Sequence, residues 1–111
     1  MKKFGFEIIL KNYSSRFGEI DLIAKKSNYI YFVEVKLRAS KSFHRPKEAV
    51  VLSKQNRIIK TAIVFLSRHK TSLQPKFAVV EVIKTTDGNF FVNFLDDAFG
   101  VFNELDLFKN F

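Results

Sequence analysis

Four charged residues interrupt two apolar stretches between Gly18 and Lys36, in the segment GEIDLIAKKSNYIYFVEVK. Glu19 and Asp21 lie in the first stretch, and Glu34 and Lys36 lie in the second. Both stretches are predicted β-strands, in which successive side chains point to opposite faces. Each strand therefore presents its two charged side chains on one face.

The turn between these strands decides which charges face each other. With the turn centred between Ser27 and Asn28, antiparallel partners have residue numbers that sum to 55, so Asp21 is predicted to lie opposite Glu34. The same register pairs the remaining acid with the lysine and puts all four charges on one face. Directly opposed like charges destabilise a sheet unless a cation lies between them. A slip by one residue would separate the two carboxylates.

Two carboxylates and a lysine on one face are the groups that a phosphodiester hydrolysis site needs. Mg²⁺ takes a few carboxylate oxygens and several waters, so Asp21 and Glu34 would suffice as side-chain ligands, with the carbonyl of Val35 as a third ligand. Lys36 would orient or help deprotonate the attacking water and neutralise phosphoryl charge, and Glu19 would assist. The alternative is a solvent-exposed face with ion pairs, in which Lys36 binds Glu19.

The rest of the chain supplies the elements that would hold this hairpin. Apolar runs separated by turn residues predict further strands, and apolar residues at helical spacing, with Ser53 as the cap, predict one helix. The predicted strands span residues 4–13, 19–25, 29–37, 76–83 and 90–95, and the helix spans residues 53–69. Residues 38–47 are predicted to form a basic loop. The segment 95–111 is consistent with a short covering helix or with a partner contact.

Length and composition limit the class of protein. A chain of 111 residues fits a single domain, residues 1–111. No apolar run approaches the ~18 residues of a membrane span, so no membrane partner is expected. The absence of cysteine excludes a disulfide framework and a thiolate metal site, which favours a cytoplasmic location.

Positive charge is concentrated in the first two thirds of the chain. Residues 1–70 contain 16 Lys and Arg against 5 Asp and Glu, whereas residues 71–111 contain 3 against 6. A concentrated basic segment is typical of a nucleic-acid partner, because each phosphate contact releases counterions. The alternative is a basic face that serves solubility. The candidate phosphate contacts are the basic residues of the loop and of the helix start: Arg38, Lys41, Arg45, Lys47, Lys54 and Arg57.

Several motifs together resemble those of the YraN-type family of small bacterial proteins. They are RFGEIDLIA, FVEVKLR, PKEAV and a Lys-Gln pair that opens the helix, spread over about residues 4–95. This family is similar to archaeal Holliday junction resolvases, within the PD-(D/E)XK nuclease superfamily. The resemblance implies an α/β fold with a restriction-endonuclease-like core, in which a mixed β-sheet contains an antiparallel hairpin and carries a flanking helix.

The resemblance also implies roles for single residues. Asp21 and Glu34 match the metal-binding acids of the superfamily, Lys36 matches its catalytic lysine, and Gln55 matches a polar helix position that faces the site. Gln55 shares a helical stripe with apolar residues, and an exposed place in the first turn is the alternative. Two acidic features of the family are missing, because its N-terminal helix with a glutamate is absent or truncated and Ala78 stands where an aspartate is usual. Both changes are expected to remove acidic groups from the site.

Three functions are compatible with these patterns. The first is a Mg²⁺- or Mn²⁺-dependent nuclease that acts on DNA, with branched DNA as a candidate substrate. The second is a nucleic-acid-binding module that kept the fold without efficient catalysis, and the third is a structural protein that forms homodimers. Affinity that falls steeply with salt separates the first two from the third. Metal-dependent cleavage that is lost in Asp21→Ala or Glu34→Ala separates the first from the second.

Overall fold

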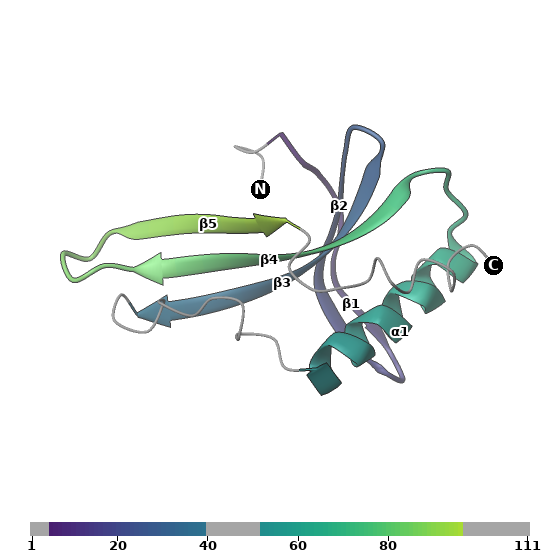
Figure 1. The fold of residues 1–111 in the computed structure, drawn as a ribbon, viewed down its shortest axis with the longest axis horizontal. Coiled ribbons are helices and arrows are strands. Elements are labelled where there is room, and N and C mark those ends of the chain that lie inside the picture. Colours follow the sequence, from purple (N-terminus) through teal and green to yellow (C-terminus); the bar gives the residue numbers. More distant parts are fainter. Residues whose placement is uncertain (1–4, 40–51, 97–111) are drawn as a thin grey trace.

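The computed structural model describes residues 5–39 and 52–96 as a mixed five-stranded sheet with one helix (Figure 1). The strands follow chain order across the sheet, and the elements are β1 (Glu7–Ser15), β2 (Gly18–Lys26), β3 (Tyr29–Ala39), α1 (Leu52–Arg68), β4 (Gln74–Lys84) and β5 (Phe90–Asp96). β3 and β4 are parallel, whereas the other neighbouring strands are antiparallel. Helix α1 lies in the crossover that a parallel pair requires. The predicted α/β class is confirmed, and the arrangement is consistent with a restriction-endonuclease-like core.

Element boundaries differ from the predictions by a few residues. The first strand runs over Glu7–Ser15 and not over residues 4–13, and β3 and β4 are both longer than predicted. Helix α1 begins at Leu52, so Ser53 lies within the first turn and the prediction that it caps the helix is wrong. β3 continues through Ala39, so the prediction that the basic loop begins at residue 38 is wrong, and residues 40–47 of that loop lie outside the described residues. The first two residues of the segment 95–111 end β5, and residues 97–111 lie outside the described residues.

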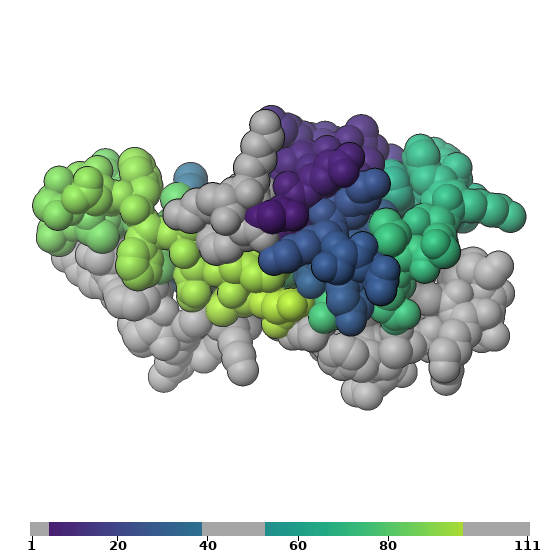
Figure 2. Space-filling model, turned by 90° about the horizontal axis from the view of Figure 1, so that it is seen from above, coloured from purple at the N-terminus to yellow at the C-terminus, as the bar shows by residue number. Residues whose placement is uncertain are grey.

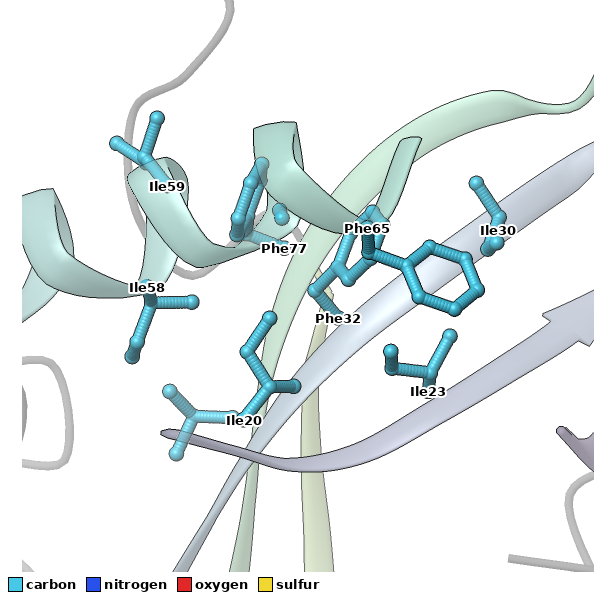
Figure 3. Packing of buried hydrophobic residues seen from close by; sticks show 10 residues of the cluster. Ile20, Ile23, Ile30, Phe32, Ile58, Ile59, Phe65 and Phe77 are labelled. Carbon is cyan, nitrogen blue, oxygen red and sulfur yellow. The ribbon is translucent and has the colours of Figure 1, made fainter. Parts of the chain in front are cut away.

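Helix α1 covers one face of the sheet and builds the larger apolar cluster (Figures 1 and 3). Ile58, Ala62 and Phe65 recur at helical spacing and are buried, as the sequence predicts. They pack with fully buried side chains of the sheet such as Phe32 and Phe77, whose ring centroids are 5.5 Å apart. Burying each such side chain stabilises the fold by about 1.5–3 kcal/mol, so this cluster fixes α1 on the sheet.

The opposite face of the sheet carries a second apolar cluster of buried side chains: Phe6, Ala24, Tyr31, Val33, Ala78 and Val80. β3 contributes buried residues to both clusters, which confirms that it is a central strand. The hairpin between β4 and β5 lies at one end of the molecule, and the chain around the end of α1 lies at the other (Figure 2). In the part of the chain that the structure describes, no helix is long and apolar enough to cross a membrane.

Candidate active site

The hairpin of β2 and β3 has the register that the turn predicts, but its ladder is shorter than expected. The paired residues run from Lys26 opposite Tyr29 to Leu22 opposite Val33, and every pair sums to 55. The ladder ends there, one pair before Asp21, so the expected backbone pairing of Asp21 with Glu34 and of Glu19 with Lys36 is wrong. β2 instead stays paired with β1 along its first residues.

Beyond the end of the ladder, the side chain of Asp21 accepts a hydrogen bond from the backbone of β3. The N–H of Val35 donates a hydrogen bond to Oδ2 of Asp21, at a distance of 2.8 Å. In an extended strand the N–H and C=O of one residue point to the same edge, so the Val35 carbonyl is directed toward the β2 side as well. The Asp21 carboxylate and the Val35 carbonyl, both predicted metal ligands, therefore lie on the same side of β3.

Glu34 is a buried carboxylate that binds two ammonium groups. Its side chain is 3% exposed, and its Oε2 lies 2.5 Å from Nζ of Lys54 and 3.5 Å from Nζ of Lys36. The predicted shared face of Glu34 and Lys36 is confirmed by this contact. Lys36 thus has Glu34 as an acidic partner, whereas Glu19 is exposed and accepts a hydrogen bond from Oγ of Ser14 at 3.3 Å.

The two acids act together on Lys54. The hydrogen bond to Glu34 raises the pKa of Lys54 above its usual value; partial burial opposes this, and the charges of Glu34 and Asp21 add to the rise. Lys54 is therefore a cation at neutral pH. Its position in the first turn of α1 brings it over the hairpin, so the site combines side chains from two separate elements.

A cleft of about 150 Å³ brings these groups together. It is lined by residues of β2, β3 and α1: Gly18, Glu19, Asp21, Glu34, Lys54, Arg57 and Ile58. Gln55 is half-buried in the first turn of α1 and is not among these lining residues, so its predicted role in the site stays a prediction. Arg57 also lines the cleft and is exposed.

Gly18 allows α1 to approach the start of β2 closely. Its φ is +155°, and a Cβ at this position would lie 3.3 Å from Cβ of Arg57. Next to it, the hydroxyls of Ser15 and Thr61 are hydrogen-bonded at 2.9 Å and tie β1 to the helix. This close packing holds the first turns of α1 against the hairpin, which is what lets Lys54 reach Glu34.

Sequence reasoning missed a second buried carboxylate on the same face of the sheet. Glu81 of β4 is fully buried and lies beside Lys36 in the parallel ladder. Its Oε2 is 3.1 Å from Nε of Arg38, and its Oε1 accepts a hydrogen bond of 3.1 Å from Nδ2 of Asn93. A single acid inside the apolar run of β4 was the available signal. Arg38, predicted to contact phosphate, is thus oriented by a buried acid.

Ala78 does not lie at the site. It is fully buried in the apolar cluster on the face opposite α1, beside Val33 and Val80. A carboxylate at position 78 would point away from Asp21 and Glu34, so the expectation that Ala78 removes an acidic group from the site is wrong.

The donor groups fit a magnesium-like ion better than a structural metal. Within residues 5–39 and 52–96, no three His, Cys, Asp or Glu side chains gather to hold a metal by themselves. Mg²⁺ needs only one or two carboxylates, because waters and substrate phosphates complete its coordination shell. The ion pair between the Lys54 ammonium and Glu34 shows that this carboxylate attracts a cation. Asp21, Glu34 and the Val35 carbonyl are compatible with such an ion.

Of the six basic residues predicted to bind nucleic acid, three lie in the described part of the chain. Lys54 and Arg57 line the cleft, and Arg38 lies two residues beyond Lys36 on the same strand. The other predicted contacts, Lys41, Arg45 and Lys47, lie outside the described residues.

Comparisons with known proteins identify the family. The profile of the "Uncharacterised protein family UPF0102" matches residues 1–82. A UPF0102 protein of Clostridium perfringens is 46% identical over 103 residues, which cover 91% of this chain and 84% of that protein. UPF0102 proteins of Clostridium botulinum and Caldicellulosiruptor saccharolyticus are 38% and 39% identical, over 91% and 89% of this chain and 85% and 86% of their own lengths. These matches confirm the resemblance to the YraN-type family, and the chain belongs to the UPF0102 family.

Proposed function

We propose that this protein is a metal-dependent nuclease that hydrolyses phosphodiester bonds in DNA, with branched DNA as a candidate substrate. The observation that carries the proposal is one cleft that contains Asp21 and Glu34, with Lys36 bound to the second acid. A buried carboxylate is costly to keep charged unless cations compensate it. Glu34 is 3% exposed and paired with two lysines, an arrangement that is typical of catalytic and ion-binding sites.

In this proposal Asp21, Glu34 and the Val35 carbonyl hold Mg²⁺ or Mn²⁺. When bound, such an ion supplies a Lewis acid for a phosphoryl oxygen and an acidified water. Lys36, which Glu34 orients, would stabilise negative charge that develops on the phosphoryl group. Glu19 at the exposed rim would accept a proton from water, and the half-buried Gln55 would contact the substrate from the first turn of α1.

Phosphates next to the reacting one would be held by the basic residues around the cleft. Arg57 is exposed at the rim, and Arg38 is oriented by Glu81 on the same face of the sheet as Lys36. Arginine held through its Nε presents a planar donor group, which suits phosphate oxygens. The loop residues Lys41, Arg45 and Lys47 would extend this basic surface.

A second function, a nucleic-acid-binding module without catalysis, has one contact in its favour. Lys54 already neutralises Glu34 at 2.5 Å, so the buried acid has a partner when no metal is bound. In that case the acids would be structural, and the basic residues alone would bind nucleic acid.

The decisive experiment measures metal binding and cleavage by the same variants. Mn²⁺ binding by calorimetry and cleavage of linear and branched DNA are compared for the wild type, Asp21→Asn and Glu34→Gln. Asp87→Asn serves as the control, because Asp87 is an exposed acid in the β4–β5 turn, outside the cleft. We expect both binding and cleavage to be lost in the two site variants and kept in the control. Salt-sensitive DNA binding without any metal-dependent cleavage would instead support the binding module.

A further inference from the structure

Two ammonium groups meet at one buried carboxylate oxygen in the cleft. Lys54 Nζ lies 2.5 Å, and Lys36 Nζ lies 3.5 Å, from Oε2 of Glu34. The nearby carboxylate of Asp21 also attracts the Lys54 ammonium. The protein therefore supplies its own cation at the two acids that are candidates for binding a metal.

The two lysines differ in the element that carries them and in how far their side chains are exposed to solvent. Lys36 lies two residues after Glu34 on the central strand, and its side chain is 26% exposed. Lys54 comes from the first turn of α1, and its side chain is 41% exposed at the end of a flexible four-carbon stem. Glu34 is buried within the sheet, so Lys54, the more exposed of the two lysines, is the group that has solvent to move into.

We propose that Lys54 is an internal counter-ion that a divalent metal must displace from Glu34, and that this exchange couples metal binding to DNA binding. The inference rests on the proposed function. A divalent ion at Oε2 of Glu34 would meet the Lys54 ammonium at short range and repel it. The displaced ammonium would find a new anionic partner in a phosphate of bound DNA.

The coupling has a defined consequence for affinity. Without DNA, the metal competes with Lys54 and binds weakly; with DNA, the ammonium has another partner and the metal binds more tightly. By linkage, the metal must raise the affinity for DNA by the same factor. Lys54 therefore acts as a positioning residue that favours metal binding when substrate is present.

The test measures Mn²⁺ affinity by calorimetry on the full chain, with and without a short duplex whose phosphorothioate linkages resist cleavage. The variants are Lys54→Met and Lys60→Met, and the second is a matched control because Lys60 is an exposed lysine of the same helix outside the cleft. We expect Lys54→Met to raise the affinity of the DNA-free protein roughly tenfold and to remove most of the gain that DNA gives. Lys60→Met should change neither value.

Two outcomes separate the failure of this proposal from the failure of the proposed function. Equal or weaker Mn²⁺ binding by Lys54→Met, with binding lost in Glu34→Gln, would overturn the displacement and leave the metal site standing. No Mn²⁺ binding by any variant, with or without DNA, would remove both proposals. Thermal unfolding confirms that each variant is folded, and Lys54→Gln, which is also neutral but less apolar, must reproduce the effect of Lys54→Met.

Discussion

Ala78→Asp tests which face of the sheet carries the site. The resemblance to the YraN-type family implies an acid at this position, so a reading of the sequence alone expects the substitution to add a metal ligand. In the structure, Ala78 is fully buried among apolar side chains on the face away from α1. It also lies directly opposite Asp96 in the ladder between β4 and β5, where like charges repel. We expect the variant to lose stability and to gain no metal affinity.

The size of the loss follows from the cost of burying a carboxylate. Burial without a partner raises the pKa of an aspartate by about 3 units. Each unit corresponds to about 1.36 kcal/mol, so the free energy of unfolding should fall by about 4 kcal/mol at pH 7. Because the unfolded carboxyl has a pKa of about 3.9, this loss should shrink as the pH falls from 7 toward 4, where both states become protonated.

Urea denaturation of the wild type, Ala78→Asp and Ala78→Asn between pH 4 and pH 7 measures this effect. The asparagine variant has nearly the same shape without a charge, so it should show the pH-independent part of the loss only. Calorimetry at pH 7 should show that folded Ala78→Asp binds Mn²⁺ no more tightly than the wild type does. A variant that is as stable as the wild type and binds Mn²⁺ more tightly would refute the placement of Ala78 on the far face.

Three further predictions concern the supports of the site. Glu81→Leu should lower the free energy of unfolding by about 3 kcal/mol, because it leaves the paired arginine side chain without its acid; a loss below about 1 kcal/mol in urea denaturation would contradict this. Gly18→Ala should lower the free energy of unfolding by about 1–3 kcal/mol in the same assay and lower the melting temperature, because the added Cβ would press on Cβ of Arg57. An unchanged melting temperature would count against the close packing. The hydrogen bond from Thr85 lowers the pKa of Asp87 below 3.8, so Asp87→Ala should be less stable than the wild type at pH 7, and the difference should vanish as the pH falls through the lowered pKa. A difference that grows on acidification would be the contrary result.

Local patterns predicted the hairpin and the helix well. A two-residue turn fixes the register of antiparallel strands, so the pairs from Lys26–Tyr29 to Leu22–Val33 could be worked out from the sequence. Helical spacing of apolar residues likewise placed Ile58, Ala62 and Phe65 in the core. Both results depend on short segments, in which sequence distance and spatial distance are closely related.

Long-range pairing and strand curvature could not be predicted in this way. No turn sets the parallel register of β3 with β4, so the neighbourhood of Lys36 and Glu81 was not visible, and neither was the face on which Ala78 lies. The early end of the β2–β3 ladder is a second example. Ile20 and Ile23 both pack under α1, which strict alternation forbids, so β2 must twist near Asp21. The twist depends on how the sheet packs against α1, so the alternation of residues along β2 could not predict it.

The parallel pairing of β3 with β4 has a consequence for the order in which the protein folds. The carboxylates Asp21 and Glu34 belong to a local hairpin, whose closure costs little chain entropy and takes microseconds in small systems. Lys54 reaches Glu34 only after α1 has docked, and β4 joins β3 across a much longer stretch of chain, from Tyr29 to Gln74. Contacts of high sequence separation form late. We therefore expect a transition state in which the hairpin that carries Asp21 and Glu34 has formed while Lys54 has not yet reached Glu34, so that replacing Lys54 should speed unfolding more than it slows folding.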